Sequence, residues 1–309
     1  MANLPSFLCV GAGKSGTTAL YNYLRQHPQV FLPAQKELQF FAWPDLKQFN
    51  KGPGTARSRD DWIKSEADYR ALYANAPNDV LAGDISPTYL HAPGAPDRMA
   101  AMLGDDLRII IMLRNPVDKV ISQYGHLRRD VREDLLLEDA LDAEKTRIDA
   151  GWGAIYHYVA TSRYSEAVQR YLDRFGPDRV HIVFFEDFVT DPVAHVRAVC
   201  RFLNIADDIA FSNDVKTNRS GLPKSKALAK VIGPNWFTSL AKMAMPRQVG
   251  VRIKTVLMNA NTGSKEQVTA ATRARLRDIF RDDVVALEKL TNRTTGWVTP
   301  VESVGEGTP

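Results

Sequence analysis

The segment with the most chemistry-bearing residues is FLCVGAGKSGTTALYNYLRQHP, residues 7–28, which passes from an apolar run into glycines, a lysine and hydroxyl residues. An amphipathic pattern follows, so the order predicts strand, loop and helix. Free backbone N–H groups and the positive end of the helix dipole converge near Gly16. Lys14 adds a positive charge, and Thr17 and Thr18 add hydroxyl donors. The segment therefore predicts a phosphate-binding loop.

The order of residues in this loop differs from that in the phosphate-binding loop of nucleotide triphosphatases. In those proteins four residues separate the first glycine from a Gly-Lys-Ser/Thr, whereas here the lysine stands before the last glycine. A glycine-rich turn with a solvated lysine is the alternative interpretation.

A second anion site is predicted where another apolar run, residues 107–113, ends. Arg114 follows that run directly, Asn115 is suited to cap a helix, and Pro116 is suited to its first position. Ser122 lies two turns into this helix. Because ligands of open α/β sheets bind at the carboxyl ends of the strands, Arg114 is expected beside the first loop.

Two anion sites on adjacent strand ends predict one ligand with two separated phosphate groups, since an arginine grips phosphate bidentately. The alternative is a structural Arg114 paired with a carboxylate, Asp118 or Asp84.

A candidate general base follows the first helix in LPAQKELQFFAWP. Glu37 stands between Lys36 and the pair Phe40 and Phe41. Neighbouring rings can desolvate a carboxylate and strengthen it as a base, and a neighbouring lysine can hold it ionised. An exposed Lys-Glu pair is the alternative. The later segment GDISPTYL contributes three further polar side chains that cap, contact an acceptor or turn the chain: Asp84, Ser86 and Tyr89.

The elements that must position these residues alternate along the chain. Strands are predicted at 6–11, 79–84, 107–113 and 179–185, and a surface loop at 44–60. Helices are predicted at 16–27, 66–75, 95–103, 116–130, 135–148, 158–175, 190–204 and 265–290. Alternating strands and helices predict an α/β protein with a P-loop-like three-layer fold, in which helices flank a central, mainly parallel sheet.

Composition is compatible with one globular domain. The chain has 309 residues, 44% hydrophobic and 25% charged, with net charge +4 and pI near 9.0, which suits an anionic ligand without demanding nucleic acid. Cys9 and Cys200 are expected to fill the core. No apolar run has the roughly 18–20 residues that span a bilayer, and the N-terminal residues show no leader pattern, so a cytoplasmic protein is expected.

One domain is predicted over residues 1–300, with a disordered tail at 301–309. Residues 212–264 form a possible lid or acceptor subregion of that domain. Within it, the basic and aromatic stretch 219–256 has three open interpretations: an acceptor lid, a peripheral membrane surface, or packed helices with a solvated basic face. The sequence does not indicate an oligomeric state.

The motifs together resemble the sulfotransferases that use 3′-phosphoadenosine 5′-phosphosulfate (PAPS), closest to the heparan sulfate branch and its bacterial relatives. GAGKSGTTAL resembles the 5′-phosphosulfate loop, LRNPVDKVISQYGH the 3′-phosphate segment, and KELQFF the segment that supplies the base. GDISPTYL, FFEDFVTDP and the late RLRDIFRDDVVALEKL also fall in family order.

The resemblance implies roles for individual residues. The 5′-phosphosulfate would be held by Lys14, Ser15, Gly16, Thr17 and Thr18. Arg114 and Ser122 would bind the 3′-phosphate, and Glu37 would act as general base, with Lys14 stabilising the leaving oxygen. Tyr164 would lie near the nucleotide, and a loop over it would supply Asn218, Arg219 and Lys224.

The implied reaction is transfer of a sulfuryl group from PAPS to a hydroxyl or amine of a glycan, glycolipid or metabolite, with no metal and no nucleic acid partner. Three features depart from the animal enzymes. Ile85 replaces a lysine found in many heparan-type members, the paired late cysteines are absent, and a Golgi-type anchor before the domain is not expected. A small-molecule kinase or nucleotide hydrolase and a non-enzymatic nucleotide-binding adaptor are the alternative hypotheses.

Overall fold

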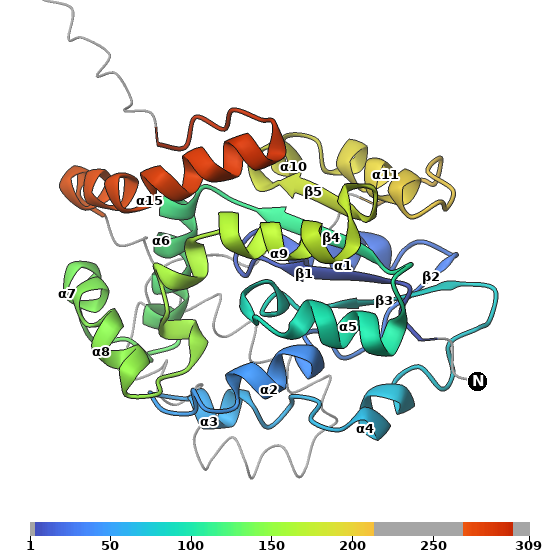
Figure 1. Ribbon diagram of the computed structural model, residues 1–309, viewed down its shortest axis with the longest axis horizontal. Coiled ribbons are helices and arrows are strands. Elements are labelled where there is room, and N and C mark those ends of the chain that lie inside the picture. The colour runs from blue at the N-terminus through green and yellow to red at the C-terminus, as the bar shows by residue number, and fades with distance from the viewer. Residues whose placement is uncertain (1–3, 213–267, 299–309) are drawn as a thin grey trace, which may run out of the picture.

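A five-stranded parallel sheet forms the centre of the protein in the computed structural model, which describes residues 4–212 and 268–298 (Figure 1). Its strand order is β2-β3-β1-β4-β5, and all four pairings are parallel. The parallel sheet that the sequence predicts is confirmed. The strands are β1 (Phe7–Gly11), β2 (Val30–Phe31), β3 (Leu81–Ile85), β4 (Arg108–Leu113) and β5 (Val180–Phe184).

Strand β2 is absent from the sequence-based prediction. It has two residues, too few to show either an alternating or a continuous apolar pattern. It exists because it pairs with β3 at the edge of the sheet, where Val30 lies opposite Leu81. A tertiary contact therefore defines this strand.

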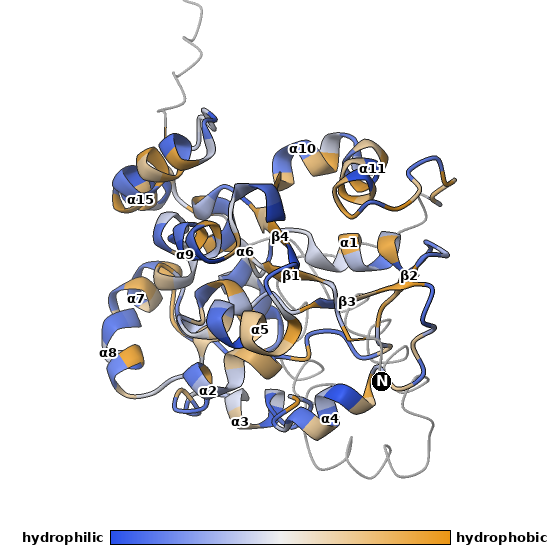
Figure 2. Ribbon diagram, turned by 45° about the vertical axis from the view of Figure 1, so that its right-hand side comes forward, coloured by the Kyte–Doolittle hydropathy of each residue, from blue (hydrophilic) through white to orange (hydrophobic). Residues whose placement is uncertain are grey.

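Helices cover both faces of the sheet, which makes three layers. On β1, Leu8 and Val10 face a cluster that includes residues of α5, α6, α9 and α15, whereas Phe7 and Cys9 face α1, α10 and α11. Figure 1 shows α5 and α9 in front of the sheet, and Figure 2 shows hydrophilic and hydrophobic colours on single helices such as α5 and α15. This two-sided burial explains the near-continuous apolar runs of the central strands.

The helices agree in most cases with the sequence-based predictions. The predicted helix 135–148 is divided at Ala143 into two short helices. The longer helices are α1 (Thr17–Leu24), α5 (Ala95–Leu103), α6 (Pro116–Arg129), α9 (Ser165–Phe175), α11 (Pro192–Phe202) and α15 (Ala270–Thr291). The shorter ones are α2 (Trp43–Leu46), α3 (Thr55–Ser58), α4 (Glu66–Ala71), α7 (Leu137–Asp142), α8 (Glu144–Asp149) and α10 (Phe185–Thr190).

The prediction of a surface loop at 44–60 is wrong in part. Helices α2 and α3 lie in this stretch, and Arg59 is buried. The Arg59 guanidinium donates to the carbonyls of Lys47 (2.9 Å) and Phe49 (2.6 Å) and also to that of Leu46, and it lies over the ring of Trp62. One buried arginine thus organises a segment whose glycines and charges are typical of a loop.

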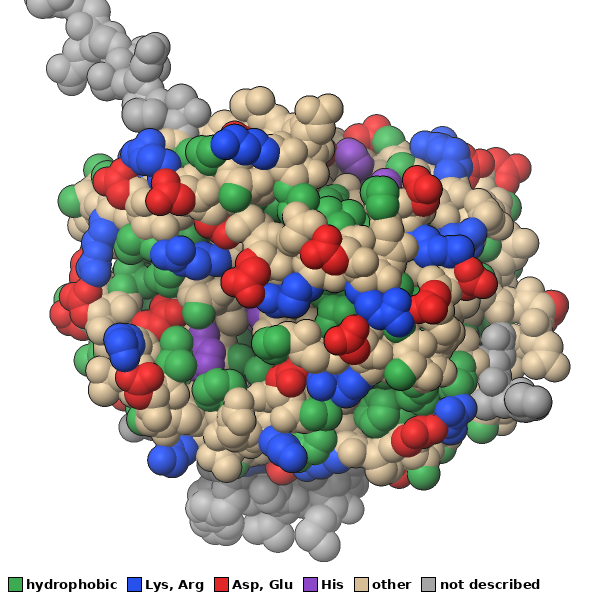
Figure 3. Space-filling model, viewed as in Figure 1, with side chains coloured by type: hydrophobic (Ala, Val, Ile, Leu, Met, Phe, Trp, Pro, Cys, Tyr) green, Lys and Arg blue, Asp and Glu red, His purple; other side chains and the backbone are tan. Residues whose placement is uncertain are grey.

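Both cysteines are free and buried, as predicted for core residues. No helix in the described residues is long and apolar enough to cross a bilayer. The face shown in Figure 3 carries acidic and basic side chains interspersed with one another.

Candidate active site

The loop between β1 and α1 has the geometry of an anion cradle. Lys14 and Gly16 both adopt left-handed conformations, with φ of 67° and 91°. In the part of the chain that the structure describes, no side-chain cap satisfies the first turn of α1, because its N-cap is Gly16, so backbone N–H groups there are available to a ligand. A Cβ at Gly16 would lie 3.0 Å from the ring of Phe185, so glycine is needed here for space as well as for φ.

Around this cradle Ser15 and Thr17 are buried, whereas Thr18 is exposed. Within residues 4–212 and 268–298 the buried Ser15 hydroxyl oxygen has no hydrogen-bond partner of normal geometry, although the hydroxyls of Ser15 and Tyr164 influence each other. An unsatisfied buried hydroxyl is unfavourable, and a phosphate oxygen is a suitable partner for it. The loop therefore fits a phosphate group on an observation independent of its glycines.

Arg114 lies directly beside this loop, as the position at the end of β4 predicts. Its Nη1 donates to the carbonyl oxygen of Lys14 at 3.1 Å, and its guanidinium lies 4.6 Å from the centre of the Phe185 ring. The Asn115 side chain caps α6 by accepting the N–H of Val117 at 3.0 Å, so the predicted cap is confirmed.

Neither carboxylate that the sequence offered as a partner, Asp118 or Asp84, pairs with Arg114. Asp118 pairs with Arg273 of α15, with 3.0 Å between Oδ1 and Nη1. Asp84 is buried and accepts hydroxyl hydrogen bonds from Tyr89 and Ser86, both at 2.7 Å. Within residues 4–212 and 268–298, Arg114 thus keeps guanidinium N–H groups for a ligand.

Tyr164 lies beside Arg114. Its hydroxyl donates to the Arg114 carbonyl at 3.0 Å, and burial raises its pKa. The Asp283 carboxylate of α15 accepts the N–H groups of Tyr164 (2.7 Å) and Ser165 (3.1 Å). These bonds explain why α9 begins at Ser165 and not at 158 as predicted. Ser122 lies half-buried on α6.

Glu37 lies in the segment that joins β2 to α2, in a left-handed conformation with φ of 63°. Its N–H donates to the carbonyl of Ile85 at 3.2 Å, and its Oε1 accepts from Lys36 Nζ at 2.7 Å. The side chain of Glu37 is 47% exposed, so Glu37 forms the Lys-Glu pair that the sequence allowed. The rings of Phe40 and Phe41 pack on Tyr69.

The loop of Glu37 is fastened to the end of β3. Ser86 Oγ accepts the N–H of Gln39 at 3.3 Å and donates to Asp84, whose carboxylate is buried. Tyr69 also donates to Asp84, at 3.1 Å. Burial raises the pKa of Asp84 to about 6, against the lowering effect of its three hydroxyl donors and of Lys36. The side chain of Ile85 is buried in the core on the α1 side, and Ile85 contacts the loop of Glu37 through its backbone carbonyl.

The charges of Lys14 and Glu37 act on each other. Desolvation lowers the pKa of Lys14 to about 8, as does the charge of Arg129, while Glu37 raises it. Desolvation raises the pKa of Glu37, but Lys36 and then Lys14 lower it, with a net shift below its usual value. Glu37 is therefore an ionised carboxylate in the field of the loop lysine.

Sequence reasoning missed three residues of this site at the end of α6: His126, Arg129 and Asp130. In its protonated form His126 would lower the pKa of Glu37, and the charge of Lys14 lowers the pKa of His126. Arg129 and Asp130 act on the pKa of Lys14. A signal was present, because His126 lies four residues after Ser122 and thus on the same face of the helix.

Three predicted nucleotide-binding residues lie outside the described residues: Asn218, Arg219 and Lys224. The same holds for the stretch 219–256, for all of the predicted subregion 212–264 except residue 212, and for the predicted tail 301–309. Within the described ranges no cluster of three or more His, Cys, Asp and Glu side chains is arranged to hold a metal ion.

The model of the sulfotransferase family matches residues 5–208, which include the loop, Glu37, Arg114 and Tyr164. The chain belongs to the sulfotransferase family. The match covers the whole sheet and the helices α1 to α11, so the site described above lies within the family domain.

Two relatives of this family member carry the words heparan sulfate in their names. The bifunctional heparan sulfate N-deacetylase/N-sulfotransferase 2 of Bos taurus is 29% identical over 299 residues, 94% of this chain and 30% of the relative. The heparan sulfate glucosamine 3-O-sulfotransferase 5 of Homo sapiens is 26% identical over 215 residues, 68% of this chain and 56% of the relative. The chain thus spans about a third and just over half of their lengths.

A solved structure agrees with the fold of this family member over nearly its whole length. The sulfotransferase from Alicyclobacillus acidocaldarius is 31% identical, covers 95% of this chain and 98% of its own, and superposes with a TM-score of 0.76. The predicted three-layer fold and the resemblance to sulfotransferases are confirmed.

Proposed function

We propose that this protein transfers the sulfuryl group of PAPS to a hydroxyl or amine of an acceptor by in-line displacement. The observation that carries the proposal is the contact between Arg114 and the Lys14 carbonyl at 3.1 Å, which joins two anion sites into one. A nucleotide with phosphates at its 5′ and 3′ ends matches two adjacent cationic sites, one at a helix N-terminus and one at an arginine.

In the proposed reaction the acceptor oxygen or nitrogen attacks sulfur and forms the new bond. The bond between sulfur and the bridging phosphate oxygen breaks, and adenosine 3′,5′-bisphosphate (PAP) leaves with that electron pair. Glu37 accepts the proton of the acceptor group. Lys14 stabilises the charge that develops on the leaving oxygen. Base assistance of this kind contributes about 10²- to 10⁴-fold in rate, and a positioned cation adds a comparable factor.

The ionisation states fit these roles. Lys36 and Lys14 hold the pKa of Glu37 low, so the carboxylate is ready to take a proton at neutral pH. Lys14, with a pKa near 8, is largely protonated there and carries the charge needed at the leaving group. The two groups therefore occupy complementary states over the same pH range.

For the acceptor we propose a glycan or a small molecule with a hydroxyl or amine group. The names of the N- and 3-O-sulfotransferase relatives support a glycan. Ile85 is buried and apolar, so this position does not supply the positive charge of the lysine that many heparan-type members have there.

Calorimetry with PAP and with ATP tests the donor, and a mass-shift screen of acceptors with isotopically labelled PAPS tests the transfer. We expect PAP to bind more tightly than ATP and a sulfated product to form without added magnesium. Tighter ATP binding with magnesium-dependent turnover would favour a kinase or nucleotide hydrolase. PAP binding without transfer to any acceptor would favour the nucleotide-binding adaptor.

A further inference from the structure

Arg129 makes a hydrogen bond that determines where the proton of His126 lies. Both residues project from the last turn of α6, and Arg129 Nη2 lies 2.7 Å from His126 Nδ1. A guanidinium has only donors and stays protonated in proteins. Nδ1 must therefore be the acceptor and carry no proton.

The other ring nitrogen faces a carboxylate. His126 Nε2 lies 3.7 Å from Asp130 Oδ2, and Asp130 also accepts from Arg129 Nε at 3.1 Å. A negative charge on this side favours a proton at Nε2, whereas the positive charge on the other side disfavours one at Nδ1. Both neighbours favour the same tautomer.

We propose that Arg129 is a positioning residue which, with Asp130, fixes His126 as the neutral tautomer protonated on Nε2. Geometry carries this inference, and the surrounding charges agree with it. The charged groups that act on the ring come from the loop after β1, the base segment, and the end of α6 with the residue after it: Lys14, Glu37, Arg129, Asp130 and Arg132.

Desolvation is the largest influence on His126 and lowers its pKa, and Lys14, Arg129 and Arg132 lower it further, to about 4. Asp130 acts in the opposite direction. Above about pH 5, where Glu37 is ionised, His126 is therefore neutral, and there it does not form a charged pair with the proposed base.

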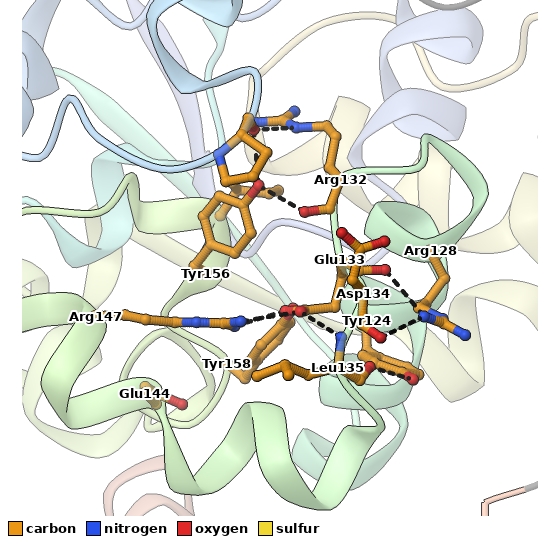
Figure 4. A network of polar contacts seen from close by, with 12 residues as sticks. Tyr124, Arg128, Arg132, Glu133, Asp134, Leu135, Glu144, Arg147, Tyr156 and Tyr158 are labelled. Atoms are coloured by element: carbon orange, nitrogen blue, oxygen red, sulfur yellow. Dashed lines mark hydrogen bonds and ion pairs between the residues drawn. The ribbon is translucent and has the colours of Figure 1, made fainter. Parts of the chain in front are cut away.

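The chain that follows α6 is anchored by a buried group of polar contacts at Glu133, three residues after Asp130. Figure 4 shows the Glu133 carboxylate receiving Arg147 in a bidentate pair, at 2.6 and 2.9 Å, and the hydroxyl of Tyr158 at 2.7 Å. Glu133 is buried, and its Oε1 also accepts the N–H of Leu135 at 3.1 Å. A buried, fully paired carboxylate strongly resists displacement.

For sulfuryl transfer, the consequence is an uncharged ring in the electrostatic field of the base and the loop lysine, with its N–H directed toward Asp130. If His126 gained a second proton, it would pair with Glu37 and hold the carboxylate away from the acceptor proton. Arg129 prevents this at mildly acidic pH. This functional part rests on the proposed function, whereas the tautomer itself does not.

The direct test is ¹⁵N NMR of the histidine-labelled full chain, with His126 assigned by its loss in His126→Gln. We expect the shifts of a neutral ring protonated on Nε2 from about pH 5 to pH 8. In Arg129→Met we expect the pKa of His126 to rise by at least about one unit. A ring protonated on Nδ1, or an unchanged titration in Arg129→Met, would overturn the proposal.

Kinetics supply the second readout. In Arg129→Met the acid loss of kcat/KM should move upward by the same interval, at least about one pH unit, whereas wild type and Arg201→Met should keep theirs. Arg201, which serves as the control, is an exposed arginine of α11 and pairs with Asp207. His126→Gln, which places an amide N–H near Nε2, should abolish the acid loss when combined with Arg129→Met. An acid loss that persists in the double variant would contradict the assigned role of His126.

If no sulfuryl transfer is found with any acceptor, the proposed function fails and the NMR experiment still decides the tautomer. If transfer is found and the NMR shows a doubly protonated His126 at neutral pH, the tautomer proposal alone fails.

Discussion

The Arg114 guanidinium donates to the backbone carbonyl of Lys14, with 3.1 Å between Nη1 and the oxygen. This bond joins the carboxyl end of β4 to the loop after β1, which are neighbouring strands at the centre of the sheet. It places the Arg114 guanidinium next to the N-terminus of α1, so the two predicted anion sites, at the loop after β1 and at Arg114, are adjacent. The predictions below follow from this arrangement.

Replacing Glu37 by Gln removes the proton acceptor and keeps the shape of the side chain. Turnover should fall by at least about 10²-fold, while the affinity for PAP in calorimetry changes little, because Glu37 is assigned to the acceptor. Glu66→Gln, which alters an exposed ion pair on α4, is the matched control and should keep full turnover. Near-normal turnover in Glu37→Gln would remove Glu37 from this role.

Arg114→Lys keeps the charge and loses the bidentate fork. PAP affinity should fall by about tenfold or more, since a charge-assisted hydrogen bond contributes about 1.5–3 kcal/mol. Adenosine 5′-phosphate lacks the 3′-phosphate and should bind to both proteins with similar affinity. If calorimetry showed equal losses of affinity for PAP and for adenosine 5′-phosphate, Arg114 would not be the group that binds the 3′-phosphate.

The pH profile should report on Lys14. Its pKa in the free protein is lowered to about 8, so its charge is present below that pH and is lost above it. We expect kcat/KM for PAPS to decline as pH rises through about 8, because this parameter follows the free enzyme. Lys14→Arg should have no such decline, whatever its absolute rate, since arginine stays charged. The same alkaline decline in Lys14→Arg would assign it to another group.

Asp84 should make stability depend on pH. Its folded-state pKa of about 6 lies above the ordinary 3.8, so the stability that this group contributes is fully present below pH 3.8 and is lost as pH rises through 6. Two units correspond to about 3 kcal/mol. Relative to Asp84→Asn, the free energy of unfolding of the wild type should fall by about that amount between acid and neutral pH. Parallel curves from denaturant titrations would contradict this prediction.

Asp283 connects the C-terminal helix to the nucleotide side of the site, because it binds the N–H groups of Tyr164 and Ser165 while Tyr164 holds Arg114. Asp283→Ala should lower stability by about 1–2 kcal/mol through the lost cap and should weaken PAP binding several-fold. Asp282→Ala, at the exposed neighbouring position, should do neither. Lost stability with unchanged PAP affinity would separate Asp283 from the site.

The sequence predicted the parts of the site that local patterns determine. The Gly-Lys-Ser-Gly-Thr-Thr order directly after a buried strand indicated the anion cradle, and the Asn-Pro pair after Arg114 indicated a capped helix start. Both depend on residues close together in the chain, and the structure contains both. The carboxyl ends of parallel strands then bring Lys14 and Arg114 together.

What depends on distant contacts was not predictable in this way. β2 is a strand because β3 lies beside it, and α9 begins at Ser165 because Asp283, more than a hundred residues later, accepts its first N–H groups. His126 and Arg129 join the site through the orientation of α6, which the packing of that helix determines. Arg59 orders residues 44–60 by bonds to carbonyls, which no side-chain pattern shows.

A crystal structure of the protein with bound PAP would test the central claim most directly. We expect the 5′-phosphate at the N-terminus of α1 against Lys14, the 3′-phosphate against the Arg114 guanidinium, and open space between the 5′-phosphate and Glu37 for the sulfuryl group and acceptor. Nucleotide bound at another place, or with its 3′-phosphate away from Arg114, would contradict the account.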